Sequence, residues 1–459
     1  MTGKRFDAIV IGAGQAGPPL AGRLTAAGRT VAVIERKFFG GTCVNTGCKP
    51  TKTMVASAYA MQMARRAAEY GFSAAGVEAD MKAVKARKDK VTLDSRAGVE
   101  GWLDGMERCT VFRGHAAFLS PHEISVDGET ISAEKIFINV GGRANVPAMP
   151  GIDEVSYLTN STIMDIDFLP EHLVIVGGSY IGLEFAQMYR RFGARVTVVE
   201  KGPRVIGRED PDISDAIKAI LEEEGVAFRL DAECISFSPR PDGVCVHVDC
   251  ATGDRDVPGT HVLLAIGRVP NTADLGLDKA GVATDERGFI KVDDELRTSQ
   301  PHIYALGDCN GRGAFTHTAY NDFEIVAANL LDGDSRRLGD RKTAYALYID
   351  PPLGRAGMTE TEARKSGRKI LVGTRPMTKV GRAVERGETK GFMKIVADAD
   401  TRELLGAAFL GASGDEVVHG ILDMIYAKAP YTVMQRMMPI HPTVSELLPT
   451  IIAEMKPVA

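Results

Sequence analysis

The sequence predicts an α/β fold with two Rossmann-like, doubly wound domains followed by a C-terminal α+β domain. A pattern of strand, glycine-rich turn, helix and second strand occurs twice, which predicts two parallel sheets covered by helices. The last part of the chain changes to a mixture of strand-like and helical segments. With 459 residues the chain is long enough for several cores. We divide it into a first domain of 1–148 and 270–339, a second of 149–269 and a third of 340–459.

Composition and charge place the protein among ordinary globular proteins. Hydrophobic residues make up 44% of the chain and charged residues 25%. A net charge of −5 gives no electrostatic reason to bind nucleic acid or an anionic membrane surface. The chain enters a strand almost at once without a signal peptide, and no apolar run approaches the roughly 20 residues of a membrane span. We therefore expect a cytoplasmic protein with no nucleic-acid or membrane partner.

The first glycine-rich unit opens the chain. Its parts follow in order: strand 6–11, glycines Gly12, Gly14 and Gly17, helix 18–27, strand 30–34 and the acidic residue Glu35. Gly12 permits a tight turn, Gly14 lets the backbone approach a pyrophosphate, and Gly17 lets helix and strand pack closely. Glu35 follows at the spacing of an acid that accepts from ribose hydroxyls. The whole arrangement predicts a dinucleotide site with the phosphates at the helix N-terminus.

The second unit repeats this arrangement with one change. Its parts are strand 173–176, glycines Gly177 and Gly182, helix 181–192, strand 195–199 and Glu200. Ser179 stands where the middle glycine is usual, and serine is small enough to keep the site. Glu200 can accept from a ribose 2′-hydroxyl and repels a 2′-phosphate, which favours NADH modestly over NADPH. Lys201 and Arg204 follow closely and could accommodate a phosphate, so NAD(P)H is the broader prediction.

A cysteine-containing stretch, GGTCVNTGCKPTK at 40–52, lies between the first unit and a predicted helix. Cys43 and Cys48 are close enough for a helical turn to bring them within disulfide range. A metal site would need two more ligands, and none lies nearby, so we predict a redox-active disulfide and no metal site. The remaining cysteines are expected to be reduced, buried thiols: Cys109, Cys234, Cys245, Cys250 and Cys309.

Two nucleotide units beside one dithiol suggest a redox relay. NAD(P)H donates hydride, a disulfide accepts two electrons through a thiolate, and a flavin couples the two reactions. The sequence therefore predicts that one nucleotide is FAD and the other NAD(P)H.

The other segments are assigned by periodicity and by glycine and proline positions. Asp308 follows a short apolar strand, where its carboxylate could meet a sugar-like chain, cap the next helix, or do both. Helices are expected over 51–70, 80–106, 317–331 and 415–428, strand-rich segments over 109–140, 226–262, 392–396 and 404–410, and a polar linker over 332–342.

Taken together, these motifs resemble the class I pyridine nucleotide–disulfide oxidoreductase family. The resemblance rests on both fingerprints, the C-x4-C pair, the run AIGRVPNT at 265–272 and the sequence HPTVSE at 441–446, in the same order over essentially the whole chain. The family includes dihydrolipoamide dehydrogenase, glutathione reductase and mercuric reductase. It implies an FAD domain, an inserted NAD(P) domain, a central segment and a C-terminal dimerisation domain. It also implies a homodimer with active sites shared across the interface.

The resemblance assigns roles residue by residue. Cys48 would be the charge-transfer thiol beside the flavin, and Cys43 the interchange thiol that meets the substrate. Lys52 and Glu184 would form an ion pair at the flavin ring. His441 and Glu446 would be an acid–base dyad contributed by the partner subunit, in agreement with the proton-transfer chemistry of histidine. The predicted cofactor-binding residues are Gly12, Gly14, Gly17, Glu35, Lys52, Asp308, Gly177, Gly182, Glu200 and Gly267.

Departures from the family pattern leave the substrate open. The last cysteine is Cys309, so the C-terminal cysteine pair of mercuric reductases is absent, although the local sequence CVNTGC favours that branch. We expect a mercuric reductase-like enzyme that reduces a small disulfide or a soft metal ion. The alternatives are a dihydrolipoamide dehydrogenase acting on a lipoyl protein and a non-catalytic flavoprotein redox sensor. Lys49 follows Cys48 as an additional cation, and we hypothesise that it lowers a thiolate pKa.

Overall fold

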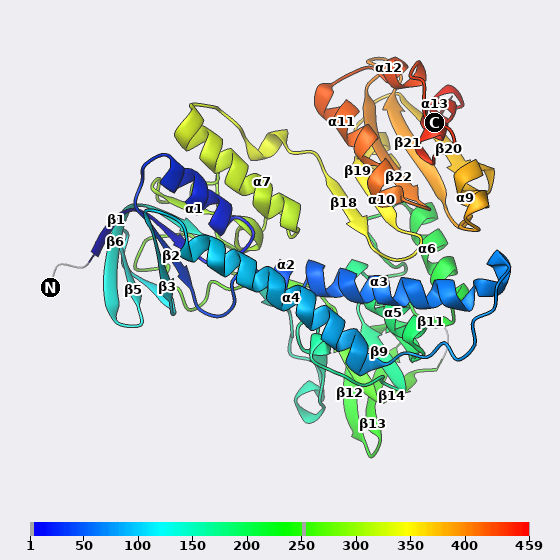
Figure 1. Cartoon of the computed structure of the whole chain (residues 1–459), viewed down its shortest axis with the longest axis horizontal. Coiled ribbons are helices and arrows are strands. Elements are labelled where there is room, and N and C mark those ends of the chain that lie inside the picture. Colours follow the sequence, from blue (N-terminus) through cyan, green and yellow to red (C-terminus); the bar gives the residue numbers. More distant parts are fainter. Residues whose placement is uncertain (1–3, 250–253, 459) are drawn as a thin grey trace.

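The computed structural model describes residues 4–249 and 254–458. Figure 1 shows an N-terminal region with α1 and α7, a second region carrying the β12–β14 sheet, and a C-terminal region with α11 to α13. Helices α3 and α4 lie side by side between these regions. The observed mixed α/β architecture agrees with the predicted fold class.

The first sheet is built on β1, whose residues are buried on both faces. Ala8 and Val10 enter a core formed with α1 and α7, whereas Ile9 and Ile11 enter a second core on the opposite face. This division explains why the segment is a continuous apolar run, as buried parallel strands usually are. The sheet has the order β3-β2-β1-β6-β5-β4, with β17 also on β6. The bounds are β1 Lys4–Ile11, β2 Val31–Glu35, β3 Cys109–Arg113, β4 Ala116–Ser120, β5 Glu123–Val126, β6 Glu129–Ile138 and β17 Ile303–Ala305.

The second parallel sheet repeats this construction around β9. Leu173 and Ile175 contribute to one core, and Val174 and Val176 to another. The order is β11-β10-β9-β15-β8, and a separate antiparallel sheet of β12-β13-β14 packs beside it. The bounds are β8 Leu158–Thr159, β9 His172–Val176, β10 Arg195–Val199, β11 Val226–Arg229, β12 Glu233–Arg240, β13 Gly243–Asp249, β14 Asp256–Gly259 and β15 His261–Leu264.

The helices of these two regions follow the prediction, with shifted ends. The helix expected over 51–70 is α3, which begins at Cys48 and ends at Arg65, before a short 3-10 turn. Helix α4 begins after Asp80, whose carboxylate accepts from the Ala83 N–H as an N-cap. The helix expected over 317–331 ends in a π-helical turn at 328–332. The bounds are α1 Gly17–Ala26, α2 Gly41–Asn45, α3 Cys48–Arg65, α4 Met81–Asp104, α5 Tyr180–Phe192, α6 Pro211–Glu223 and α7 Thr316–Ala327.

The C-terminal region is an antiparallel sheet with short helices, as an α+β domain requires. Its order is β18-β19-β22-β21-β20-β23. The single helix expected over 415–428 is interrupted at Val418, where α10 ends and α11 begins. The strand bounds are β18 Ala344–Leu347, β19 Leu353–Gly357, β20 Ile370–Pro376, β21 Phe392–Asp398, β22 Leu404–Leu410 and β23 Lys456–Pro457. The helix bounds are α8 Glu360–Lys365, α9 Gly381–Glu385, α10 Gly414–Val417, α11 His419–Ala427, α12 Thr432–Gln435 and α13 Leu448–Ala453.

Two short strands cross between the first and second regions. Strand β7 (Gly142–Ala144) pairs with β16 (Arg268–Pro270). The chain therefore leaves the first region and returns to it at the same place. The predicted domain limits at 148 and 270 fall beside this pair, and the division of the chain remains a prediction. The segment 332–342 is more ordered than a polar linker, because Leu338 is buried and Arg341 pairs with Asp322.

The cysteine prediction is only partly correct. Cys245 and Cys309 are buried as expected and Cys109 is half-buried, but Cys234 is exposed, because it lies on β12 at an irregularity in the pairing with β13. Cys250 lies outside the described residues. Within the described chain, no helix combines the length and apolar character needed to cross a membrane.

Candidate active site

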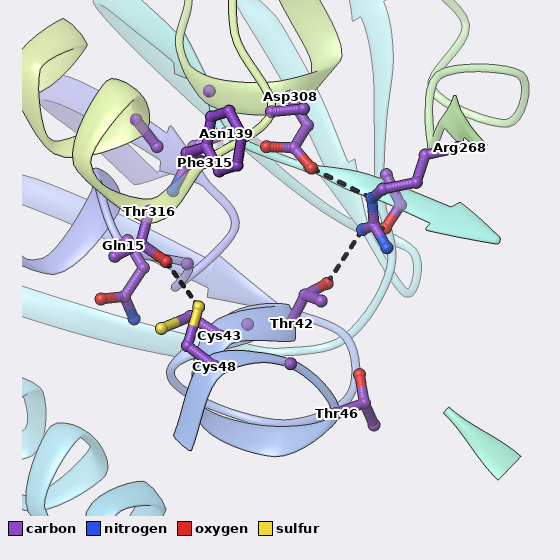
Figure 2. Close-up of a pocket in the computed structure, with 18 of the residues that line it drawn as sticks. Gln15, Thr42, Cys43, Thr46, Cys48, Asn139, Arg268, Asp308, Phe315 and Thr316 are labelled. Carbon is purple, nitrogen blue, oxygen red and sulfur yellow. Dashed lines mark hydrogen bonds and ion pairs between the residues drawn. The ribbon is translucent and has the colours of Figure 1, made fainter. Parts of the chain in front are cut away.

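The predicted dithiol lies at the junction of two helices. Cys43 is in α2 and Cys48 is the first residue of α3, with Thr46 and Gly47 between the two helices. Gly41 lies so close to Gly14 that a Cβ atom there would be 2.9 Å from the Gly14 Cα. The glycine turn of the first unit thus holds the dithiol beside it. Both cysteines are free thiols in this structure, and Figure 2 shows their sulfur atoms side by side.

The two thiols have opposite electrostatic environments. A hydrogen bond from the Cys43 thiol, with further contributions from Thr316 and Lys52, lowers the pKa of Cys48 to about 6 against the opposing effect of desolvation. The same bond and burial raise the pKa of Cys43. The Thr316 hydroxyl lies 3.2 Å from the Cys48 sulfur (Figure 2). Cys48 is therefore the thiolate of the pair and Cys43 the thiol that retains its proton.

An ion pair lies one turn along α3 from Cys48. The Lys52 Nζ donates to the Glu184 Oε2 across 2.6 Å, and Glu184 on α5 is buried with 4% of its side chain exposed. The other carboxylate oxygen accepts from the Tyr348 N–H at 3.0 Å, and Lys52 also lies over the Tyr348 ring at 4.5 Å. The predicted lysine–glutamate pair is thus formed, and segments distant in sequence hold it.

A single cavity of about 1270 Å³ connects the dithiol with the first glycine unit. Of the predicted residues, the cavity is lined by Gly12, Gly14, Glu35, Cys43, Cys48, Lys52, Glu184 and Asp308. The cavity extends from Glu35, the acidic residue of the first unit, to the dithiol, and its volume suits an extended dinucleotide.

The turn of the first unit has the geometry that the fingerprint requires. Gly12 has a φ of +104°, a conformation that disfavours other residues. A Cβ atom on Gly17 would lie 2.3 Å from the Gly12 carbonyl oxygen, so only glycine allows helix and turn to meet. Glu35 accepts from the Ala13 N–H at 3.0 Å and the Lys37 N–H at 2.8 Å, which fixes its carboxylate at the mouth of the turn.

The second unit reproduces this geometry. Gly177 has a φ of +113°, and a Cβ atom on Gly182 would lie 2.0 Å from the Gly177 carbonyl oxygen. Glu200 accepts from the Gly178 N–H at 2.6 Å and the Gly202 N–H at 2.8 Å, as Glu35 does in the first unit. Ser179 is the N-cap residue of α5, so its substitution for glycine leaves the turn intact.

Gly267 and Asp308 lie near the paired strands that cross between regions. Gly267 turns the chain into β16 with a φ of +101°. Asp308 pairs with the Arg268 guanidinium at 3.3 Å, and burial raises the pKa of Asp308 while Arg268 opposes this shift. The alternative prediction that Asp308 caps the next helix is wrong: the N-cap of α7 is Phe315, because a glycine turn and loop intervene.

The predicted dyad forms, but away from the dithiol of its own chain. His441 Nδ1 lies 2.9 Å from Glu446 Oε2, and the histidine side chain is 81% exposed. Neither residue belongs to the described lining of the cavity. Exposed apolar side chains precede this segment in the sequence, namely Tyr426, Val433, Met437, Met438 and Ile440.

Several residues of the site were not predicted from the sequence. Thr316 contacts Cys48, and Arg268 reaches Asp308, the Gly142 carbonyl and, at 3.4 Å, the Thr42 hydroxyl (Figure 2). Arg268 belongs to the AIGRVPNT motif, so the motif itself was an available signal. Thr316 and Tyr348 have no comparable local pattern, because their roles arise from contacts between distant segments.

Comparisons with known proteins agree with this arrangement. Residues 6–322 match the family described as pyridine nucleotide-disulphide oxidoreductase, and residues 343–452 match its dimerisation domain. A solved structure described as the Cu(II) complex of the HOCl-induced flavoprotein disulfide reductase RclA from Escherichia coli has a TM-score of 0.90 and 35% sequence identity. The structural match spans 98% of this chain and 99% of the RclA chain.

Curated relatives match over similar lengths. The probable pyridine nucleotide-disulfide oxidoreductase RclA of E. coli is 36% identical, covering 97% of this chain and 98% of its own. A dihydrolipoyl dehydrogenase of Thermus scotoductus is 33% identical, covering 96% of each, and a mercuric reductase of Streptomyces lividans is 34% identical, covering 90% and 88%. The chain therefore belongs to the pyridine nucleotide–disulphide oxidoreductase family, whose members are flavoprotein enzymes that depend on FAD and use NAD(P)H.

Proposed function

We propose that this enzyme is an NAD(P)H-dependent reductase that uses the Cys43–Cys48 dithiol to reduce a soft metal ion or a small disulfide. The observation that carries the proposal is the polarised thiol pair, in which the Cys48 thiolate accepts from the Cys43 thiol. In the given sequence no cysteine follows Cys309, so it offers no counterpart of the C-terminal cysteine pair of mercuric reductases. The substrate therefore comes to Cys43 directly.

The cavity fits FAD in shape and in the chemistry of its ends. Gly12, Gly14 and Glu35 would hold the dinucleotide end, and Asp308 the sugar-like chain, while the Lys52–Glu184 pair would lie beside the ring. Bound FAD supplies the two-electron relay between NAD(P)H and the disulfide.

The reaction at the cysteines balances in electrons and protons. The reduced pair loses two electrons as the Cys43–Cys48 bond forms, and the Cys43 proton is released. Those two electrons convert two Cu(II) ions to two Cu(I), or reduce one disulfide to two thiols with protons from the surroundings. Lowering the pKa of Cys48 keeps its sulfur anionic, while the raised pKa of Cys43 means that the attacking sulfur needs a base.

We assign that base to His441 of a second subunit. Glu446 lies against Nδ1 of the ring and orients it, as the acidic member of a catalytic triad orients its histidine. Nε2 is then left to exchange a proton with Cys43. The exposure of His441, the exposed apolar side chains at 426–440 and the match to a dimerisation domain favour a site completed in a homodimer.

NADH is the favoured donor. Two backbone N–H groups hold the Glu200 carboxylate at the second glycine turn, where it repels a 2′-phosphate. The Arg204 guanidinium lies 3.3 Å from Asp215, so one of the two nearby cations is already partnered.

A substrate panel tests the proposal. We expect NADH to reduce the FAD-loaded enzyme anaerobically to a two-electron form with thiolate-to-flavin charge-transfer absorbance, followed by turnover with Cu(II), Hg(II) or a small disulfide. Turnover confined to lipoamide would instead make the enzyme a dihydrolipoamide dehydrogenase acting on a lipoyl protein. If NADH produced no charge-transfer form, the dithiol would be idle and the chain would be a redox sensor rather than a reductase.

A further inference from the structure

A second cluster of metal-binding side chains lies on the β12–β14 sheet. Along β13, Val244, Val246 and Val248 are buried in the core shared with β9. Cys245 and His247 alternate with these valines, so they share the opposite face of the strand. Asp256 is the direct partner of His247 on β14. One thiol, one imidazole and one carboxylate thus converge from two adjacent strands.

The distances within this cluster are short. The His247 Nδ1 lies 2.7 Å from the Asp256 Oδ1 and 3.9 Å from the Cys245 sulfur. All three ligand atoms lie within 4.8 Å of one another. Tetrahedral zinc, with bonds of about 2.0 Å to nitrogen and about 2.3 Å to sulfur, separates two such ligands by about 3.5 Å. The side chain of Asp256 is 71% exposed, so it has room to adjust.

A fourth side chain orients the imidazole. The His247 Nε2 lies 2.8 Å from the Ser238 hydroxyl on β12, on the other side of β13 from Asp256. When Nδ1 binds a metal ion, the ring proton lies on Nε2 and the Ser238 hydroxyl accepts it, which directs Nδ1 toward Cys245 and Asp256. Metal-ligating histidines are commonly fixed in this way, through the ring nitrogen that does not bind the metal.

We propose that Cys245, His247 and Asp256 form a binding site for a borderline divalent cation, with Zn²⁺ as the preferred ion. The thiolate and carboxylate would neutralise the cation, and mixed sulfur, nitrogen and oxygen ligands suit zinc. Three protein ligands leave one coordination position for water. On binding, the cation replaces the proton between His247 and Asp256 and the thiol proton of Cys245. The site differs from the sequence-based expectation that the chain binds no metal.

The cluster is separate from the dithiol. The β12–β14 sheet extends from the second nucleotide region, whereas Cys43 and Cys48 belong to α2 and α3, which meet near the centre of Figure 1. Zn²⁺ is not reduced under biological conditions, so an ion held here would cross-link β13 and β14 rather than serve as substrate. The inference therefore does not depend on the proposed reductase activity.

Zinc binding can be measured on the FAD-loaded, full-length protein in a Cys43→Ser/Cys48→Ser background, which removes the other thiol pair. After chelator treatment and equilibrium dialysis against buffered Zn²⁺, we expect one zinc per chain by elemental analysis. We expect His247→Ala and Cys245→Ser to abolish this binding. Ser238→Ala should weaken it about 10- to 100-fold, because the ligand remains but loses its orientation. Cys234→Ser, on the neighbouring strand, is the matched control and should bind zinc unchanged.

Thermal unfolding gives a second readout that separates lost binding from lost folding. Zn²⁺ should raise the unfolding temperature of the background protein and of Cys234→Ser, but not that of His247→Ala. Flavin content and the zinc-free unfolding temperature should be alike in all three. The proposal is overturned if the background protein binds no zinc, or if His247→Ala and Cys245→Ser bind as much as the background.

Discussion

The Lys52 ammonium lies 2.6 Å from the Glu184 carboxylate, which joins the helix that begins at the dithiol to the first helix of the second nucleotide unit. Glu184 is almost completely buried, and Lys52 is 33% exposed. Removing one partner therefore leaves a buried carboxylate without its counter-charge, which costs more than the loss of a surface ion pair.

We expect Lys52→Met to lower the free energy of unfolding by about 1–3 kcal/mol, because Glu184 keeps only its backbone hydrogen bond from Tyr348. Urea unfolding of the FAD-loaded protein measures this change. Lys49→Met is the matched control on the same helix, since Lys49 is exposed and its ammonium donates to a neutral hydroxyl, that of Ser95. A control as destabilised as Lys52→Met would contradict a specific role for the buried pair.

The Cys48 thiolate predicts a pH dependence. As pH falls through about 6, Cys48 gains a proton, so the thiolate-to-flavin absorbance of the two-electron-reduced enzyme should disappear. Cys43→Ala cannot form the disulfide, so its oxidised form already pairs a free Cys48 with oxidised flavin, and there the transition should lie at higher pH because the largest stabilising hydrogen bond is lost. Cys43→Ser keeps a donor and should move it less, and Thr316→Val should have a smaller effect than Cys43→Ala.

The same titration tests the hypothesis about Lys49. The charge of Lys49 lowers the pKa of Cys43, but less than the hydrogen bond to Cys48 and burial raise it. The cation that lowers the pKa of Cys48 is Lys52. We therefore expect Lys49→Ala to leave the absorbance transition where it is. A clear shift to higher pH would instead support the hypothesis that Lys49 lowers the thiolate pKa.

A shared active site can be tested by mixing two inactive variants. We expect His441→Gln to lower turnover about 10²- to 10⁴-fold, while NADH still reduces the flavin and disulfide. A refolded 1:1 mixture of His441→Gln and Cys43→Ser chains should regain about a quarter of wild-type activity, because random pairing makes half of the dimers mixed and each mixed dimer has one complete site of two. If the refolded mixture stayed inactive, His441 would not act on the partner's dithiol.

Substitutions in the two glycine turns should impair the binding of different nucleotides. Gly17→Ala forces a Cβ atom against the Gly12 carbonyl oxygen and should cost about 1–3 kcal/mol, with loss of bound FAD measured by absorbance. Gly182→Ala should instead raise the KM for NADH with FAD retained. Gly98→Ala, at an exposed position in α4 with open space around it, should stabilise the protein by about 0.5–1 kcal/mol.

Nicotinamide preference should follow Glu200. We expect Glu200→Ser to lower kcat/KM for NADH and raise it for NADPH, because the substitution removes both the ribose acceptor and the repulsion of a 2′-phosphate. Steady-state kinetics with both donors measure the ratio. A wild-type enzyme that already preferred NADPH, or a ratio unchanged by the substitution, would show that Glu200 does not select the donor.

The glycine turns and the histidine–glutamate dyad were predictable from the sequence, because each depends on residues close together in the chain. Gly12, Gly17, Gly177 and Gly182 adopt conformations or close contacts that only glycine permits, so their spacing alone indicates the turns. The dyad of His441 and Glu446 also forms within one short segment. The break at Val418 and the π-helical end of α7 were missed, because helical periodicity continues through both.

The sequence by itself determined the two nucleotide units, the dithiol and the family, because each is encoded in the spacing of neighbouring residues. The resemblance assigned the charge-transfer role to Cys48, but only the tertiary structure gives a physical reason: Thr316 reaches Cys48 from α7, and the thiol of Cys43 donates to it. The tertiary structure also decided that Asp308 pairs with Arg268 and that Cys245, His247 and Asp256 meet on one sheet face. Contacts of this kind depend on how strands and helices pack across long sequence separations, which no local pattern records.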